Sequence, residues 1–289
     1  MGHSICGTQP GSIFWFNWDN YGILNALGAF LVLLFGFYVV FFIILNNDYS
    51  GSDHYWTLYF ALIYCFGNAF IAHFRCIFTD PGSVPFDSEP INYDIEDNSI
   101  MKCTRCNSYK PPRAHHCSVC RRCIVKMDHH CPWINNCVGI RNTKFFVLYL
   151  LYVFLCSICG FIMSILHVKW TDGAGHPLDY WPKFCTTSLV VICLLFGLFT
   201  FSLLCDMIYV CTTGVTGIDE KQRKTFNYSD RYKAIAEVFG GDGHFSLLWL
   251  IPISPYFKNY EDIVGYRYVK PMPSLSQESN TDCQPLLTH

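Results

Sequence analysis

Four long apolar stretches dominate the chain, and polar segments separate them. They cover residues 23–45, 56–74, 145–166 and 188–210, and within them the only acidic, basic or histidine side chains are His73 and Asp206. A helix needs about 20 apolar residues, at roughly 1.5 Å each, to cross the apolar core of a bilayer. The pattern therefore predicts an all-α polytopic membrane protein with four transmembrane helices.

The polar segments define the expected organisation of the chain. It divides into an N-terminal tail (1–22), two membrane helices (23–78), a cysteine-rich domain (79–144), two more membrane helices (145–210), a membrane-associated C-terminal segment (211–270) and a disordered tail (271–289). Within the C-terminal segment, residues 245–257 are aromatic and interrupted by proline, so we expect them to lie on the membrane surface. The tail is rich in Ser, Gln and Pro, a composition typical of disorder.

Basic residues predict the orientation in the membrane. Residues 75–144 contain ten Lys and Arg and the part after residue 210 contains eight, whereas the two loops on the other side contain two in total. Because cytosolic loops carry the excess of Lys and Arg, the cysteine-rich domain and both termini are expected in the cytosol. On that topology the sequon at residues 227–229 stays unglycosylated.

Composition agrees with a membrane protein. The chain is 52% hydrophobic and only 15% charged, against a usual charged share of about 25%. Its formal net charge of -2 gives no excess of positive charge for a nucleic-acid backbone. We therefore expect a lipid bilayer as a partner and no nucleic acid.

Cysteines cluster in the central polar segment. Seven of the 17 cysteines lie within residues 103–137. A cytosolic segment is kept reduced, so these thiols are expected to bind metal or to catalyse rather than to form disulfides. Three Cys-x2-Cys pairs, in which two residues separate the cysteines, are interleaved with histidines, and this pattern strongly indicates zinc. A domain this small also needs metal to compensate for its limited core.

A count of ligands leaves one cysteine over. Two tetrahedral zinc sites need eight ligands, and the cluster offers seven cysteines and four histidines: His115, His116, His129 and His130. If each site takes three cysteines and one histidine, one cysteine and two histidines remain. Spacing alone leaves open whether the spare thiol is Cys131 or Cys137.

Local chemistry favours Cys131 as the free thiol. It follows Asp128 and His129 in the chain. A thiol with a pKa of about 8.5 is largely protonated at neutral pH, and a neighbouring imidazole activates it. An acidic group can orient that imidazole, as in other Cys-His-acid sites. The alternative is a zinc module in which all these residues serve only to bind a partner.

At these residues the sequence resembles the DHHC family of protein S-acyltransferases (palmitoyltransferases). The motifs are CTRC (103–106), AHHCSVCRRC (114–123) and KMDHHCPWINNCVG (126–139), followed by KFF (144–146). A DPG tripeptide after the second apolar stretch and the arrangement of two helix pairs around a cytosolic domain also resemble the family. The resemblance covers most of the chain.

The resemblance implies an interleaved set of ligands for two structural Zn²⁺ ions. One ion would be held by Cys103, Cys106, His116 and Cys123, and the other by Cys117, Cys120, His130 and Cys137. Asp128, His129 and Cys131 are then left as the catalytic residues.

Two C-terminal motifs depart from the family pattern. The TTxE element falls on residues 216–219, with Gly217 in place of the second threonine and Asp219 in place of glutamate. Ala234 stands where the family usually has an asparagine, four residues before Val-Phe-Gly. Both departures concern how the C-terminal segment supports the active site.

The resemblance implies an enzyme with a two-step reaction. His129 would take the proton of Cys131, and the thiolate would attack palmitoyl-CoA or another long-chain fatty acyl-CoA. The acyl group would then pass to a cytosolic juxtamembrane cysteine of a substrate protein. The expected location is the Golgi or the endoplasmic reticulum. Basic side chains are candidates for the phosphates of CoA: Arg105, Lys110, Arg113, Arg121 and Arg122.

Two other classes of protein are compatible with parts of the sequence. A catalytically silent membrane scaffold would bind zinc without being acylated, and the altered C-terminal motifs favour it. A metal or thiol transporter would need polar ligands inside the apolar stretches, which contain few.

Overall fold

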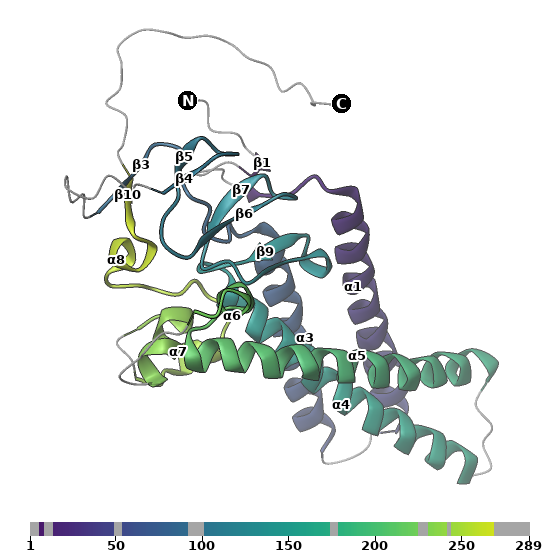
Figure 1. Ribbon diagram of the computed structural model, residues 1–289. Helices are drawn as coiled ribbons and strands as arrows, with labels where there is room; N and C mark the ends of the chain where they lie inside the picture. The colour runs from purple at the N-terminus through teal and green to yellow at the C-terminus, as the bar shows by residue number, and fades with distance from the viewer. Residues whose placement is uncertain are drawn as a thin grey trace, which may run out of the picture.

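The computed structural model of the chain describes residues 6–8, 14–48, 54–91, 101–173, 179–224, 231–241 and 244–268. The sequon at 227–229 and the tail 271–289 lie outside these residues. Helices account for most of the described residues, and short strands form the part between the second and third long helices (Figure 1).

Four helical segments are long and apolar enough to cross a membrane. The first joins α1 (Asn20–Tyr38), the π-helical stretch η1 (Val39–Leu45) and α2 (Asn46–Asp48), and the others are α3 (Tyr55–Phe78), α4 (Thr143–Gly173) and α5 (Tyr180–Thr213). Each predicted apolar stretch lies inside one of these segments, so the four-helix prediction is confirmed. The helices extend past the apolar stretches because backbone hydrogen bonding continues into their polar ends.

The ends of the long helices follow from local sequence. Asp19 caps α1 by accepting a hydrogen bond of 2.7 Å from the backbone N–H of Gly22, the usual role of an N-terminal aspartate. The helix α5 ends at Gly214, whose φ of 67° suits glycine. The helices pack with α4 between α3 and α5, while outward side chains such as Leu24 and Leu198 remain exposed. Such apolar surface suits contact with lipid.

The cysteine-rich domain is a set of short antiparallel hairpins at one end of the helices (Figure 1). They pair β4 (Lys102–Cys103) with β5 (Ser108–Tyr109), β6 (Ala114–Cys117) with β7 (Arg122–Val125), and β8 (His129–Cys131) with β9 (Asn136–Val138). A single 3₁₀ turn, η2 (Pro132–Ile134), connects the last two strands.

The other elements surround this domain. They are β1 (Cys6–Gly7), β2 (Phe14–Trp15), β3 (Ser88–Pro90), α6 (Gly217–Lys221), α7 (Arg231–Phe239), η3 (Leu247–Leu250), α8 (Tyr260–Val264) and β10 (Tyr266–Tyr268). The strand β10 pairs with β3, so the C-terminal segment returns to the cysteine-rich domain.

Asn136 joins the cysteine-rich domain to the membrane helices. Its side-chain amide donates hydrogen bonds of 2.9 Å to the carbonyls of Cys76 and Thr79 at the end of α3. Its side-chain oxygen accepts a bond of 2.8 Å from the indole N–H of Trp15. Because Asn136 is the cross-strand partner of Cys131, these contacts fix the position of that cysteine relative to α3.

Candidate active site

Strand geometry separates the two adjacent histidines of β8. Successive side chains of a strand point to opposite faces, so His129 and Cys131 share one face and His130 lies on the other. Nδ1 of His130 lies 3.4–3.6 Å from the sulfurs of Cys117, Cys120 and Cys137. His129 instead contacts Asp128 and Cys131. The sequence HHC thus contributes to two different clusters.

Asp128, His129 and Cys131 form a connected group. Nδ1 of His129 donates a hydrogen bond of 2.6 Å to Oδ2 of Asp128, and the Cys131 thiol lies close enough to the imidazole to raise its pKa. The Phe146 ring lies edge-on to the imidazole at 5.5 Å. Cys131 is only 4% exposed. A buried thiol beside an acid-oriented imidazole is the arrangement of an activated nucleophile.

The pKa values of this group reflect its contacts. Burial lowers the pKa of the His129 imidazole, but the hydrogen bond to Asp128 and the contact with Cys131 raise it more, and the pKa rises to about 9. Burial raises the pKa of the Asp128 carboxyl, but hydrogen bonds from His129 and from the Gly217 amide bring it below its ordinary value. The surroundings therefore stabilise a carboxylate on Asp128 next to an imidazolium on His129.

Eight further side chains form two clusters that could each hold a metal ion. The first contains Cys103, Cys106, His116 and Cys123, the second Cys117, Cys120, His130 and Cys137, and within each cluster all ligand atoms lie within 4.8 Å of one another. Cys131 belongs to neither cluster. Tetrahedral zinc ligands at about 2.3 Å (sulfur) and 2.0 Å (nitrogen) are about 3.6 Å apart, and the sulfur–Nδ1 distances of 3.2–3.6 Å match this. The two clusters fit two zinc ions.

The two clusters are built from the same turn. In each first Cys-x2-Cys pair the backbone N–H of the second cysteine points to the sulfur of the first, at 3.5 Å for Cys106 and 3.3 Å for Cys120. The residue after each pair, Asn107 or Arg121, has a positive φ of 50° or 54°. This left-handed residue reverses the chain and points both sulfurs inward.

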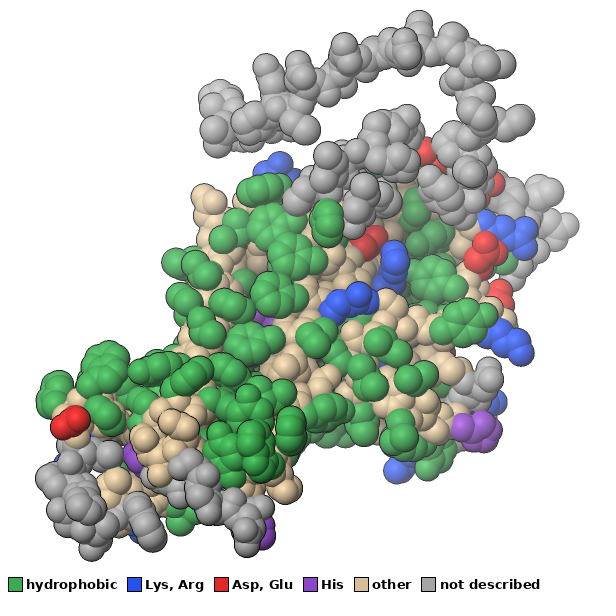
Figure 2. Space-filling model, turned by 180° about the vertical axis from the view of Figure 1, so that it is seen from behind, with side chains coloured by type: hydrophobic (Ala, Val, Ile, Leu, Met, Phe, Trp, Pro, Cys, Tyr) green, Lys and Arg blue, Asp and Glu red, His purple; other side chains and the backbone are tan. Residues whose placement is uncertain are grey.

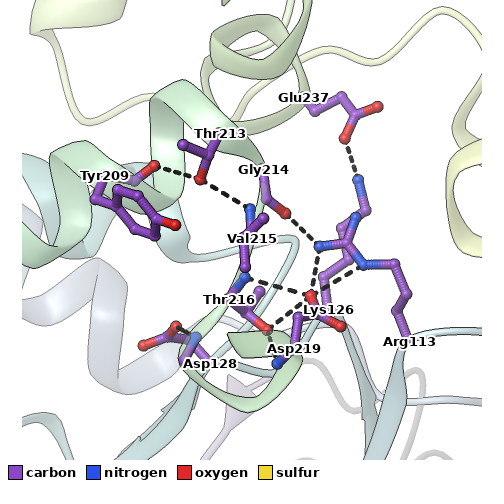
Figure 3. A network of polar contacts seen from close by, with 11 residues as sticks. Arg113, Lys126, Asp128, Tyr209, Thr213, Gly214, Val215, Thr216, Asp219 and Glu237 are labelled. Atoms are coloured by element: carbon purple, nitrogen blue, oxygen red, sulfur yellow. Dashed lines mark hydrogen bonds and ion pairs between the residues drawn. The ribbon is translucent and has the colours of Figure 1, made fainter. Parts of the chain in front are cut away.

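The N-terminus of α6 contacts the Asp128 carboxylate. The backbone N–H of Gly217 donates a hydrogen bond of 2.6 Å to Oδ1 of Asp128. The turn that presents this N–H is a capping box in which Thr216 and Asp219 bond to each other's backbone N–H. Oδ2 of Asp219 also accepts bonds of 3.2 and 2.8 Å from Nε and Nη2 of Arg113, which in turn donates to the Gly214 carbonyl (Figure 3).

The structure shows what stands at each of the three changed positions of the C-terminal motifs. Gly217 needs no side chain, because its backbone N–H makes the bond to Asp128. Asp219 retains the carboxylate that accepts from Arg113. Ala234 is buried and lines a small cavity beside the ion pair of Lys126 with Glu237. The link between the C-terminal segment and Asp128 is therefore present despite the altered motifs.

A narrow apolar cavity lies among the membrane helices near this group. Its lining comes from η1 and four long helices and includes Gly36, Tyr149, Cys156, Cys193 and Phe196. Trp133, two residues after Cys131, contacts Phe196 with ring centres 6.2 Å apart. Cys131 itself belongs to the same buried apolar cluster as the helices.

The five basic side chains that are candidates for contact with the CoA phosphates differ in their exposure to solvent and in the groups that they already bind. The Arg122 guanidinium is buried, lies 3.7 Å from the Phe86 ring and donates to the Val84 carbonyl. Arg113 is held by Asp219. Two candidates, Arg105 and Arg121, are exposed, and Lys110 is half-buried close to His115.

Several residues that support the site could not be recognised from the sequence. The N–H of Gly217 is a backbone group, which any residue type except proline could supply. Asn136 and Trp15 act through contacts between segments far apart in the chain. Only the Thr-x2-Asp spacing of the capping box gave a local signal.

Comparison with known proteins agrees with this arrangement. The sequence pattern of the family described as "DHHC palmitoyltransferase" matches residues 96–224. Palmitoyltransferase ZDHHC3-A of Danio rerio is 35% identical over 260 residues, covering 84% of this chain and 80% of that protein. Palmitoyltransferase ZDHHC3 of Homo sapiens is 34% identical over 279 residues, with 90% and 89% covered. Probable protein S-acyltransferase 13 of Arabidopsis thaliana is 32% identical over 270 residues, with 80% and 86% covered.

A four-helix membrane protein with two metal-binding clusters and a separate Asp-His-Cys group is thus an acyltransferase in class. The chain belongs to the DHHC palmitoyltransferase family. The resemblance seen in the sequence and the expectation of a multi-pass membrane enzyme are confirmed.

Proposed function

We propose that this chain transfers a long-chain fatty acyl group from palmitoyl-CoA, or another long-chain acyl-CoA, to cysteines of membrane-proximal proteins. The reaction passes through a thioester on Cys131. The observation that carries the proposal is the contact of Cys131 with an imidazole that Asp128 orients, outside both metal-binding clusters. A scaffold would not require this free, activated thiol.

In the first step His129 receives the proton of the Cys131 thiol. Its Nδ1 is occupied by Asp128, so Nε2 is the nitrogen available to the sulfur. The thiolate attacks the thioester carbonyl of the acyl-CoA, and the CoA thiolate leaves with the proton from His129. In the second step His129 takes the proton of a substrate cysteine, the resulting thiolate attacks the thioester carbonyl of the acyl-enzyme, and the Cys131 thiolate leaves and regains that proton from His129. No oxidant or reductant is consumed.

Both metal-binding clusters would hold structural zinc. Each offers four protein ligands, so a bound ion has no open position for water or substrate. Its task is to hold β6 to β9 in place, because the domain has little apolar core of its own. The proposed ligands are Cys103, Cys106, His116 and Cys123 for one ion, and Cys117, Cys120, His130 and Cys137 for the other.

The apolar cavity supports a long acyl chain as the transferred group. Exposing the roughly 14 methylenes of a palmitoyl chain to water costs on the order of 11 kcal/mol, at about 0.8 kcal/mol each. A cavity lined by residues such as Tyr149 and Phe196 would keep the chain of the acyl-enzyme out of water. Burial and the positive charges of Lys110 and Lys224 lower the pKa of His115, and these two lysines are the basic side chains that we assign to the CoA phosphates.

The topology proposed from Lys and Arg puts the cysteine-rich domain and both termini in the cytosol, in a Golgi or endoplasmic reticulum membrane. The substrate cysteines would then be cytosolic and juxtamembrane. The domain limits given by the polar pattern (79–144 for the cysteine-rich domain and 211–270 for the C-terminal segment) belong to the same proposal.

The test uses purified protein in detergent and palmitoyl-CoA with an alkyne tag. We expect label on the wild type, release of the label by hydroxylamine, which cleaves thioesters, and none on Cys131→Ser. Folded, zinc-loaded wild type that takes up no label would contradict the enzyme proposal and favour a zinc scaffold. Label that persists on the variant would show that another cysteine is the nucleophile.

A further inference from the structure

The segment from residue 244 to 257 lies against the ends of α3 and α4 nearest the cysteine-rich domain. Nζ of Lys144 donates a hydrogen bond of 2.9 Å to the Leu248 carbonyl, and Oη of Tyr152 donates one of 2.7 Å to the Leu250 carbonyl. Tyr152 follows Thr143, the first residue of α4, by nine positions, or about 14 Å at 1.5 Å per residue. This part of the C-terminal segment therefore lies beside the membrane-spanning surface.

The side chains of this segment match such a position. Most of its apolar residues point outward and are exposed: Phe245, Leu247, Leu248, Leu250, Ile251, Ile253 and Tyr256. In Figure 2 apolar side chains cover much of the face seen from behind, and Lys and Arg side chains lie near its middle and along its right-hand edge. An exposed apolar segment that continues a lipid-facing surface is expected to insert into the adjoining leaflet.

A cavity of about 340 Å³ opens where this segment meets the end of α3. We call it the headgroup cavity. Its walls combine one guanidinium, several hydroxyls and three aromatic rings, from Thr79, Arg141, Ser254, Pro255, Tyr256, Phe257 and Tyr260. Aromatic residues with a polar edge and arginines are the usual contacts of a protein with the headgroup layer.

An exposed apolar stripe of α3 ends at this cavity. Phe60, Tyr64, Ile71 and Phe78 are all exposed, and their spacing of 4, 7 and 7 residues puts them on one face of the helix. Thr79, the residue after Phe78, lines the headgroup cavity. A lipid chain lying on this stripe would bring its own headgroup to the cavity.

The charged groups in and directly behind the cavity wall favour an anion. The Arg141 side chain is half exposed and its ion pair with Asp80 is long, at 3.5 Å. That carboxylate already accepts hydrogen bonds from the backbone N–H groups of Gly82 and Ser83 and from the Ser83 hydroxyl. Arg75 donates to the Ser254 hydroxyl, and its Nε is buried with no hydrogen-bond partner among the described residues. Two guanidiniums against one carboxylate leave net positive charge.

We propose that the headgroup cavity binds the negatively charged headgroup of an anionic phospholipid from the adjoining leaflet, and disfavours a headgroup whose phosphate is neutralised by its own cation. Arg141 and Arg75 contact the phosphate and any further anionic group, Tyr256 and Tyr260 flank the headgroup, and the acyl chains follow the α3 stripe. Arginine suits this role because its planar donors match phosphate oxygens. The lipid would join the C-terminal segment to α3, and it is neither donor nor acceptor in the acyl transfer proposed above.

The test measures binding of tail-labelled fluorescent phosphatidylserine and phosphatidylcholine to zinc-loaded protein in detergent micelles. We expect phosphatidylserine to bind the wild type at least about tenfold more tightly, a difference of about 1.4 kcal/mol, and Arg141→Gln to abolish the preference. Arg141→Lys should keep part of it. Arg267→Gln is the matched control, because this exposed arginine pairs with Glu261 and does not line the cavity. Ser254→Phe, which fills the cavity without changing charge, should also abolish the preference.

Three results would overturn the proposal. The first is equal preference in the wild type and Arg141→Gln. The second is an equal loss in Arg267→Gln, which would indicate attraction by surface charge alone. The third is a raised KM for palmitoyl-CoA in Arg141→Gln assayed in pure phosphatidylcholine, which would assign the cavity to the phosphates of CoA. Autoacylation at the wild-type rate in that membrane, together with lost lipid preference, supports the lipid site independently of the proposed reaction.

Discussion

Replacing Asp219 by asparagine should weaken both the fold and the reaction, because Asp219 supports the turn that contacts Asp128. Its carboxylate is fully buried and accepts hydrogen bonds from Arg113 and from the Thr216 hydroxyl and backbone N–H. Removing one partner of a buried ion pair costs about 3–5 kcal/mol. Because the Arg113 side chain is 13% exposed, water offsets part of this loss, and we expect about 2–3 kcal/mol.

The effect on the reaction follows from the bond between the Gly217 N–H and Asp128. A hydrogen bond to a charged group contributes about 1.5–3 kcal/mol, equivalent to about a 10- to 160-fold change in rate if the whole of it is lost in the transition state. We therefore expect Asp219→Asn to label Cys131 at least about tenfold more slowly than the wild type. Thermal unfolding and the rate of hydroxylamine-sensitive labelling are the two measurements.

Glu220→Gln is the matched control, since Glu220 is the exposed neighbour of Asp219 on α6. It removes the same charge and should leave both measurements unchanged. Wild-type labelling and wild-type stability in Asp219→Asn would refute the reasoning. A loss of stability without any loss of rate would show that the Gly217 contact does not assist His129.

The stability difference should also depend on pH. Burial raises the pKa of the Asp219 carboxyl, but its hydrogen bond and ion pair with Arg113 lower it more, so the net pKa is depressed. A carboxyl group whose pKa is lower in the folded than in the unfolded chain stabilises the fold at pH values above its unfolded-state pKa, which is near 4. That stabilisation is lost as the pH falls through the folded-state pKa. The gap between Asp219→Asn and Glu220→Gln should therefore narrow below about pH 4.

Three further substitutions test separate contacts. Gly217→Ala should keep the labelling rate within about twofold, because the backbone N–H remains and the new Cβ would meet Asp128 Oδ1 at an ordinary 3.4 Å; a large loss would contradict this. Gly139→Ala should destabilise the fold in thermal unfolding by about 1–3 kcal/mol, since its Cβ would come within 2.5 Å of the Pro81 carbonyl. Cys137→Ser should lower bound zinc, measured by a chromogenic chelator, from two ions towards one; retention of both ions would contradict the ligand assignment.

The membrane helices were predictable because spanning a bilayer requires about 20 consecutive apolar residues, and such a run can be recognised within each segment by itself. The separation of His129 from His130 has the same local origin, since strand alternation puts neighbours on opposite faces. The sequence alone did not say which of the two histidines binds metal, and the family pattern suggested His130. The pairing of β8 with β9 explains this assignment, because it directs His130 and His129 to opposite faces.

The support around Asp128 could not be predicted in the same way. Arg113 and Asp219 are 106 positions apart, and nothing near either residue indicates the other. The altered motif at residues 216–219 suggested weakened support, but a pattern of side chains does not reveal a backbone N–H such as that of Gly217. Trp15 likewise meets Asn136 across 121 positions, a contact that depends on how the N-terminal segment returns to the cysteine-rich domain.

If the proposed reaction is right, an acyl group on Cys131 lies on the path to the substrate cysteine. The most direct measurement is a single-turnover chase. Enzyme is labelled with alkyne-tagged palmitoyl-CoA, the free donor is removed, and an acceptor protein with a juxtamembrane cysteine is added. Label should leave Cys131 at the rate at which it arrives on the acceptor. Label that remains on the enzyme while fresh donor still acylates the acceptor, or an acceptor acylated by Cys131→Ser, would contradict it.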